Sequence, residues 1–387
     1  MNPLVELARF GQSYWLDDLA RPMIEGGELQ RRVTSEGLTG VTVNPAIFRA
    51  ALHGSDAYDQ QISELAAHPL NDIYEALIVS DVRDACDIFR PVYDHTEGRD
   101  GFVSLEVSPY LARDTQGSIM EARRLWEAVA RPNLLIKIPG TFEGIAAIEA
   151  LLFAGINVNI TLLFSVERYE EVARAYMNAL DRRKAAGQPV SGIASVASFF
   201  LSRIDTRIDE QLRQKLSAGM SEAGRLLGKA AIANAKIAYR RFKELTSTGR
   251  WRALENAGAY PQRLLWASTS TKNPAYDDLM YVEPLIGPHT INTLPRKTIA
   301  AFAEHGKVTA SVEQGSEEAS QIMRDLRRAG IDVPLVTREL LDEGIDKFIE
   351  SFDDTLQTIG TKVLTGSRAE RPGNATRSNR GADVRPA

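Results

Sequence analysis

The stretch of residues 131–165 constrains the fold of this chain more than any other. It begins with an apolar run over 134–138 that contains one lysine, Lys137. A helical pattern follows from 143 to 153, and a second apolar run covers 157–164. A strand, a helix and a strand in this order predict a βαβ unit, and continuous apolar strands are typical of a parallel sheet buried on both faces.

Lys137 is unusual in such a strand, because an ammonium group is costly to bury unless it is paired or neutral. A neutral amine can attack a carbonyl to form a Schiff base. The alternative is that the side chain reaches solvent from the strand end. Two observations favour a functional role for Lys137. Only 11 of the 46 Lys and Arg residues are lysine. In addition, Asn157, Asn159 and Thr161 alternate along the second strand. Alternating residues point to one face of a strand.

Composition narrows the class of protein. The chain has 387 residues, enough for one large domain or two, and 44% are hydrophobic, which suffices for a sizeable core. Its net charge of −5 argues against a general nucleic-acid or membrane-surface binder. A single cysteine, Cys86, excludes an internal disulfide framework. With no signal-peptide pattern and no apolar run near the roughly 18 residues of a membrane span, we expect a cytoplasmic protein.

Strand patterns alternate with helical patterns along most of the chain. The strands are predicted at 13–19, 41–45, 102–107, 134–138, 157–164, 192–200, 264–268 and 290–294, the last being the weakest. The helices between them are predicted at 23–36, 47–68, 71–93, 114–130, 143–153, 166–186 and 206–245, the last broken near 218–219. Eight such alternations predict an α/β protein with a single closed (β/α)8 barrel, a TIM barrel.

The C-terminal region extends this barrel. Residues from 296 to about 364 are helical and amphipathic in pattern, and we expect them to pack on the outside of the barrel. The domain is therefore predicted to span 1–365, a barrel with appended helices. Residues 366–387 have almost no large apolar side chains, so this polar tail is predicted to be disordered.

Polar residues gather where a barrel of this kind carries its chemistry, at the C-terminal ends of the strands. They are Asp17, Asn44, Glu106, Lys137, Asn159, Thr161 and Ser198. Taken singly, Asp17 could cap a helix, Asn44 could shape a turn before proline, and Glu106 could form an edge-strand ion pair. Their coincidence at one end of the barrel favours a shared site. The five histidines lack metal-ligand spacing, and no phosphate-binding loop, GxGxxG or GxSxG motif is present, so we predict neither a metal nor a cofactor.

Four strings in the sequence resemble the transaldolase family, Schiff-base-forming enzymes of the class I aldolase superfamily. They are 40–45 (GVTVNP), 103–107 (VSLEV), 135–144 (LIKIPGTFEG) and 155–165 (GINVNITLLFS). Their order and spacing follow the family from Asp17 to about Ser268. The helical region after Arg203 and the region from 296 onward resemble the longer bacterial subgroup of that family.

The resemblance implies a catalytic role for four residues. Lys137 would attack the ketose carbonyl and form the imine. Asp17 would take the proton of the C4 hydroxyl and return it to the acceptor aldehyde. Glu106 and Thr161, through a bound water, would move protons while the imine forms and is hydrolysed. The iminium is its own electron sink, so the family needs no metal or cofactor.

The resemblance also implies a substrate-binding role for five residues. Asn44 and Asn159 would hold the dihydroxyacetone hydroxyls, assisted by Ser198. Arg203 would bind the sugar phosphate, since a guanidinium suits bidentate phosphate recognition. Many relatives place a second arginine after the seventh strand, whereas this chain has Lys272 in that region, which could act as a point charge.

Three functions follow as expectations. The first is a transaldolase of the pentose phosphate pathway, which transfers a dihydroxyacetone unit from sedoheptulose 7-phosphate or fructose 6-phosphate to glyceraldehyde 3-phosphate or erythrose 4-phosphate. The second is a lyase of the same superfamily that releases free dihydroxyacetone, and the third is a non-catalytic barrel that binds partners on its outer helices. The presence of Asp17, Glu106 and Lys137 together favours the transferase. Its partners would be sugar phosphates, without nucleic acid or membrane, and either a monomer or a homodimer is compatible with the sequence.

Overall fold

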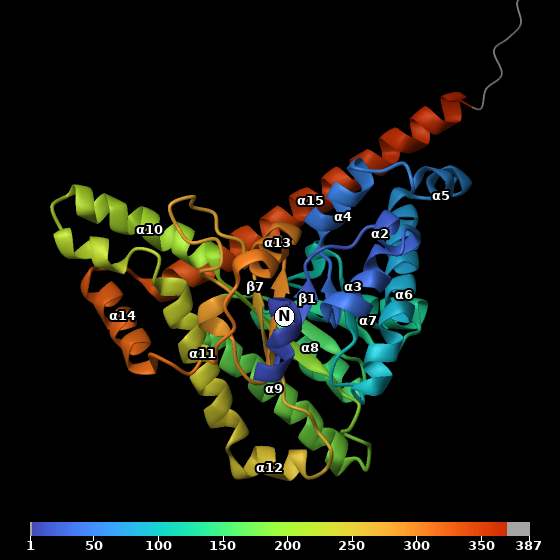
Figure 1. Cartoon of the computed structure of the whole chain (residues 1–387). Helices are drawn as coiled ribbons and strands as arrows, with labels where there is room; N and C mark the ends of the chain where they lie inside the picture. Colours follow the sequence, from blue (N-terminus) through green and yellow to red (C-terminus); the bar gives the residue numbers. More distant parts are fainter. Residues whose placement is uncertain (1, 370–387) are drawn as a thin grey trace, which may run out of the picture.

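The computed structural model describes residues 2–369, and its centre is a closed barrel of parallel strands in chain order (Figure 1). The strands are β1 (Gln12–Leu16), β2 (Gly40–Thr42), β3 (Phe102–Glu106), β4 (Leu134–Pro139), β5 (Val158–Leu163), β6 (Ser195–Phe200), β7 (Arg263–Ala267) and β8 (Thr290–Leu294). The predicted (β/α)8 barrel is confirmed, and β8, the weakest predicted strand, spans the residues expected for it.

The helices surround the barrel, and several differ from the predicted ranges. They are α1 (Pro3–Glu6), α2 (Arg21–Glu25), α3 (Glu28–Glu36), α4 (Pro45–His53), α5 (Asp59–Glu64), α6 (Leu70–His95), α7 (Thr115–Val129), α8 (Phe142–Ala154), α9 (Val166–Ala185), α10 (Ser202–Ser217), α11 (Ala230–Thr246), α12 (Gly249–Glu255), α13 (Arg296–His305), α14 (Ser316–Arg328) and α15 (Val333–Ala369). The helix predicted over 47–68 is wrong as one element, because α4 ends at His53 with Gly54 as its C-cap and a separate helix, α5, begins at Asp59. The helix predicted over 23–36 divides at Gly27, whose φ of 70° belongs to the left-handed region that glycine adopts readily.

The register between neighbouring strands positions the polar side chains. Glu106 on β3 pairs with Lys137 on β4, and Lys137 pairs with Asn159 on β5. Every residue of β4 and β5 is buried, as expected for strands covered on both faces. Because side chains alternate along a strand, residues at paired positions that point into the barrel meet at one level inside it.

Strand β5 is irregular close to its C-terminal end. Its register with β6 shifts between Ile160 and Leu163, and Leu162 between them has a φ of 59°. A leucine in the left-handed region costs free energy that glycine would not, about 1–2 kcal/mol. Such strain persists where the surrounding structure imposes it, and it is common near functional sites.

The C-terminal helices do not all lie where they were predicted. Helix α14 packs against α11 on the outside of the barrel, as expected. Helix α15 instead crosses the end of the barrel toward which the strands point, and it contacts α4, α10, β5 and the short 3-10 helix η2 (Pro109–Leu111) that follows β3 (Figure 1). An amphipathic pattern shows that one face is buried but not against which surface, so the expectation of an outside position was wrong for α15.

Two further expectations concern the domain boundary at residue 365 and the absence of a membrane-spanning segment. Helix α15 continues through Ala369, so the predicted boundary at 365 lies inside a helix, and residues 370–387 of the predicted tail lie outside the described residues. Within residues 2–369, no helix is both long and apolar enough to cross a membrane.

Candidate active site

Lys137 and Glu106 form a buried ion pair inside the barrel. The Lys137 side chain does not reach solvent, since the residue is only 4% exposed. Its Nζ lies 3.2 Å from Glu106 Oε2 and donates to the carbonyl oxygen of Val43 at 3.1 Å. Burial raises the pKa of the Glu106 carboxyl, while the charge and the hydrogen bond of Lys137 act in the opposite direction. The pair is therefore close enough for a proton to pass between the amine and the carboxyl.

Asp17 follows β1 and is held by a threonine of the next strand. Its Oδ1 accepts a hydrogen bond from the Thr42 hydroxyl at 2.7 Å, and Thr42 lies 2.7 Å from the Thr293 hydroxyl. Burial raises the pKa of Asp17, against the hydrogen bond from Thr42 and the charge of Lys137. The residue at the N-cap of the following helix α2 is Ala20, so the reading of Asp17 as a helix cap is wrong.

Asn159 is oriented by hydroxyl groups on both neighbouring sides. Its Nδ2 donates to Ser104 Oγ at 3.0 Å, and its Oδ1 accepts from the Ser198 hydroxyl at 2.6 Å. All three residues are buried. The two hydroxyls therefore hold the plane of the amide in place between β3 and β6.

Two buried side-chain oxygens on the strands next to β4 lack a protein partner. They are Glu106 Oε1 on β3 and Thr161 Oγ1 on β5, and neither has a hydrogen bond within residues 2–369. Buried polar atoms are normally hydrogen-bonded. Both oxygens are thus available to a polar ligand or a water molecule beside the lysine.

Asn44 and Asn157 both have local structural roles. The Oδ1 atom of Asn44 caps α4 by accepting from the Ile47 N–H at 3.0 Å, so the local reading holds for this oxygen and only its Nδ2 is free to serve a ligand. Asn157 lies just before β5, where its Nδ2 donates to the Pro132 carbonyl and its Oδ1 accepts from the Ala194 N–H, both at 2.9 Å. It ties neighbouring loops together, and only Asn159 and Thr161 of the predicted trio belong to the site.

Arg203 and Lys272 bring two positive charges to the rim of the barrel. Arg203 lies in the first turn of α10 with its guanidinium 5.7 Å from the ring centre of Phe200, and its Nη1 is buried without a partner in the described chain. Burial lowers the pKa of Arg203. The pKa of Lys272 is lowered, first by burial and then by repulsion from Arg203, although attraction to Asp17 opposes this shift. Two cations this close favour a bound anion.

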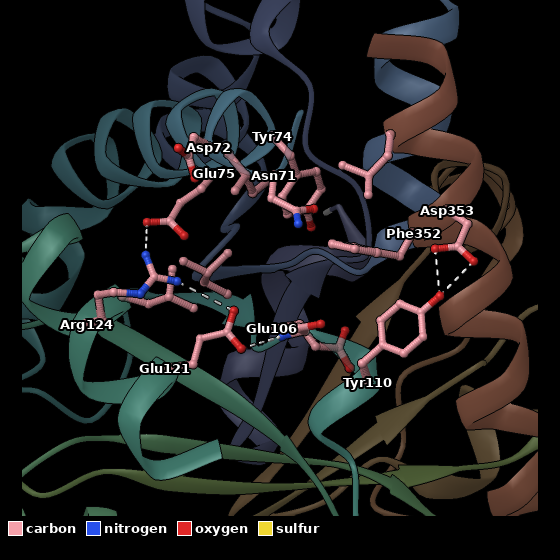
Figure 2. Close-up of a pocket in the computed structure, with 15 residues that line it drawn as sticks. Asn71, Asp72, Tyr74, Glu75, Glu106, Tyr110, Glu121, Arg124, Phe352 and Asp353 are labelled. Atoms are coloured by element: carbon pink, nitrogen blue, oxygen red, sulfur yellow. Dashed lines mark hydrogen bonds and ion pairs between the residues drawn. The ribbon is translucent and has the colours of Figure 1, made fainter. Parts of the chain in front are cut away.

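A cavity of about 690 Å³ lies beyond the end of β3, between α6, α7 and α15, and Glu106 also lines it (Figure 2). Arg124 is held there by Glu75 and by Glu121, which lies 3.7 Å from it, and the Tyr110 hydroxyl points to Asp353 of α15. Acidic side chains outnumber the one arginine in its lining. An anionic ligand would be repelled here, so we place the candidate site inside the barrel.

Sequence reasoning missed three residues of this site: Thr42, Ser104 and Thr293. Ser104 precedes Glu106 by two positions on β3, so strand alternation was the signal that could have found it. Thr42 stands two residues before Asn44 in the same string, whereas nothing in the sequence marks Thr293. Within the described residues, no group of three or more His, Cys, Asp or Glu side chains could hold a metal ion.

Comparisons with known proteins match nearly the whole chain. Residues 14–359 match the family model described as Transaldolase/Fructose-6-phosphate aldolase, and this span includes every side chain of the candidate site. The chain is 49% identical to a transaldolase of Trichodesmium erythraeum over 371 residues, covering 94% of this chain and 98% of that protein. It is 46% identical to transaldolases of Thiobacillus denitrificans, over 93% of this chain and 100% of the relative, and of Mycolicibacterium smegmatis, over 92% and 96%.

The ion pair predicts how stability responds to substitution. Lys137→Met leaves the Glu106 carboxylate buried without its partner, which typically costs about 3–5 kcal/mol. The loss of Lys137 also raises the pKa of Glu106 further. A carboxyl whose pKa is higher in the folded than in the unfolded protein destabilises the fold as pH rises above the pKa of the unfolded state. Urea unfolding should therefore show a larger loss of stability at about pH 8 than at about pH 5.

The control for this experiment also removes the negative charge of Glu106. In the variant Lys137→Met/Glu106→Gln the Glu106 carboxylate is absent, so the difference between the two pH values should shrink to the part that comes from Asp17, whose pKa the charge of Lys137 also lowers. A loss of stability that is the same at both pH values in Lys137→Met alone would contradict the buried pair.

Proposed function

The chain belongs to the transaldolase/fructose-6-phosphate aldolase family, and we propose that it transfers a dihydroxyacetone unit from a ketose phosphate to an aldose phosphate through a Schiff base on Lys137. It is a transferase of the transaldolase type. Its proposed donors are sedoheptulose 7-phosphate and fructose 6-phosphate, and its acceptors glyceraldehyde 3-phosphate and erythrose 4-phosphate, in the cytoplasmic pentose phosphate pathway. The observation that supports this most is the buried Lys137 amine beside Glu106 and near Asp17.

The first step of the proposed mechanism joins Lys137 to the substrate. The lone pair of the neutral amine attacks the ketose carbonyl, and the carbonyl oxygen takes up a proton. Glu106 can receive the proton that the amine loses, because Oε2 lies 3.2 Å from Nζ. The resulting hydroxyl takes up the proton held by Glu106 and leaves as water, and the oxygens of Glu106 and Thr161 that lack protein partners can bind that water and move its protons.

The second step breaks the bond between C3 and C4. Asp17 takes the proton of the C4 hydroxyl, the C4 oxygen becomes a carbonyl, and the electron pair of the broken bond moves into the iminium to give an enamine. The aldose phosphate leaves. The acceptor aldehyde then undergoes the reverse step, in which the enamine carbon forms the new bond and Asp17 returns its proton. Water finally hydrolyses the imine and releases the product from Lys137.

Substrate binding uses the groups left free by the protein's own hydrogen bonds. The Asn159 amide, fixed by Ser104 and Ser198, and the Nδ2 of Asn44 are proposed to hold the dihydroxyacetone hydroxyls. Arg203 and Lys272 are proposed to bind the phosphate, supported by their shared position and by the free Nη1 of Arg203.

Transfer and release of the three-carbon unit are distinguished by the need for an acceptor. Purified protein should consume fructose 6-phosphate rapidly only when erythrose 4-phosphate is present, with sedoheptulose 7-phosphate as the product. The measurement is a coupled assay for glyceraldehyde 3-phosphate and sedoheptulose 7-phosphate with and without acceptor. Free dihydroxyacetone formed at a rate unaffected by erythrose 4-phosphate would replace the transferase with the lyase.

The raised pKa of Asp17 predicts the acid side of the pH profile. Asp17 must be ionised to accept the C4 proton, so kcat should fall, as pH decreases, at a higher pH than an ordinary aspartate would give. Thr42→Val removes the hydrogen bond that favours the ionised carboxyl, so the acid limb of kcat against pH should move to still higher pH.

Thr293→Val is the matched control for this substitution. It removes a hydroxyl that contacts Thr42 rather than Asp17, so it should move the acid limb less. A limb that stays in place in Thr42→Val would show that another group controls it.

A further inference from the structure

Helix α15 lies directly against the barrel at a glycine, Gly344. A Cβ atom placed on Gly344 would lie 2.9 Å from Leu162 Cδ2 and 3.5 Å from Arg203 Nη1. A carbon–carbon approach of 2.9 Å is too short for a real Cβ, so any side chain here requires a neighbour to move. The absent side chain therefore allows the helix backbone to lie directly against Leu162 and Arg203.

The atom of Leu162 that would meet such a side chain is a terminal methyl, and it can shift only within a buried, packed environment. Leu162 is only 1% exposed, and it has the left-handed backbone conformation that follows Thr161 in β5. Close-packed interiors transmit a displacement to the next group when the first one cannot yield. The other group beside Gly344 is the Arg203 guanidinium, which is therefore the group that a side chain at this position would displace.

The residue before Gly344 connects α15 to the helix that carries Arg203. Glu343 forms an ion pair with Arg207, which lies one turn after Arg203 on α10, and Glu339 lies 3.5 Å from Arg207 on the preceding turn of α15. The negative charge of Glu343 also acts on Arg203, where it opposes the effect of burial on the pKa. The two helices are thus clamped together beside the guanidinium.

We propose that Gly344 and Glu343 of α15 form a wall of the substrate-phosphate site and position Arg203 for the phosphate. The proposal rests on the proposed function, in which Arg203 binds that phosphate. The buried Nη1 of Arg203 without a protein partner supports it, because such a donor is left available for an anion. Arg203 is the binding residue, and Gly344 and Glu343 are positioning residues.

The test substitutes Gly344→Ala and measures inhibition by inorganic phosphate, competing with fructose 6-phosphate. The inhibition constant of phosphate and the KM of fructose 6-phosphate should both rise on the order of tenfold, because a charge-assisted hydrogen bond loses its geometry. The kcat at saturating substrate should change by less than about threefold, since Lys137, Glu106 and Asp17 keep their places. A purely structural role would instead lower the melting temperature and leave phosphate inhibition unchanged.

Gly360→Ala is the matched control on the same helix. A Cβ there would lie 3.5 Å from Leu70 Cδ1, an ordinary contact, so the same gain in helix propensity comes without displacement. Its inhibition constant for phosphate should equal that of the unsubstituted protein. An inhibition constant in Gly344→Ala that stays within about twofold of this control would overturn the proposal.

A second variant keeps the proposal testable if Gly344→Ala does not fold. Arg207→Met releases the clamp between α10 and α15 at a half-buried surface position, and it should weaken phosphate inhibition about two- to threefold. Arg213→Met removes the same charge from α10, where Arg213 pairs with Asp209 of its own helix, and it should leave the inhibition constant unchanged. Equal inhibition constants in these two variants would also overturn the proposal.

The same experiments separate this inference from the proposed function. If the unsubstituted protein fails to consume fructose 6-phosphate in the presence of erythrose 4-phosphate, the proposed function is wrong. If it is active and phosphate inhibits Gly344→Ala and Gly360→Ala equally, only the role of α15 is wrong.

Discussion

The site depends on a charged lysine side chain that is kept out of water. Lys137 and Glu106 are both nearly inaccessible, and each would be strongly disfavoured as an ion without the other. The closed barrel supplies the enclosure, since its strands leave no open edge through which water could solvate the pair. The pairing in turn keeps a proton within reach of an amine that must lose one to react. Burial and reactivity therefore have the same structural cause.

The register of the barrel connects this pair to the rest of the site. Because β3, β4 and β5 are neighbours in space as well as in sequence, Glu106, Lys137 and Asn159 meet on one level although the helices α7 and α8 separate them in the chain. Strand alternation brings Ser104 to Asn159 by the same rule. Helix α15 closes over this end of the barrel, where it carries a glycine against β5 and Arg203. The appended helix is thus part of the site's surroundings and not only an addition to the fold.

Sequence patterns predicted the parts of the structure that follow from local periodicity. The eight strands were predictable because each is an apolar run between two helical patterns. The position of Lys137 inside one of these runs indicated a site at the C-terminal ends of the strands. The strain at Leu162 was not predictable, since leucine gives no sign of a left-handed conformation and the bulge arises from pairing between β5 and β6. The place of α15 could not be predicted either, because its partners lie far away in the chain. The prediction that Asn157 shares a face with Asn159 and Thr161 was wrong for a related reason. Asn157 lies just before the first residue of β5, so strand alternation does not set the direction of its side chain.

The central claim is that Lys137 forms a covalent imine with the substrate, and the most direct measurement is chemical trapping. The protein is incubated with fructose 6-phosphate, reduced with borohydride and digested, and the modified peptide is identified by mass. We expect a reduced dihydroxyacetone adduct on Lys137. An unmodified Lys137 in folded, substrate-bound protein, or an adduct on a different lysine, would contradict it.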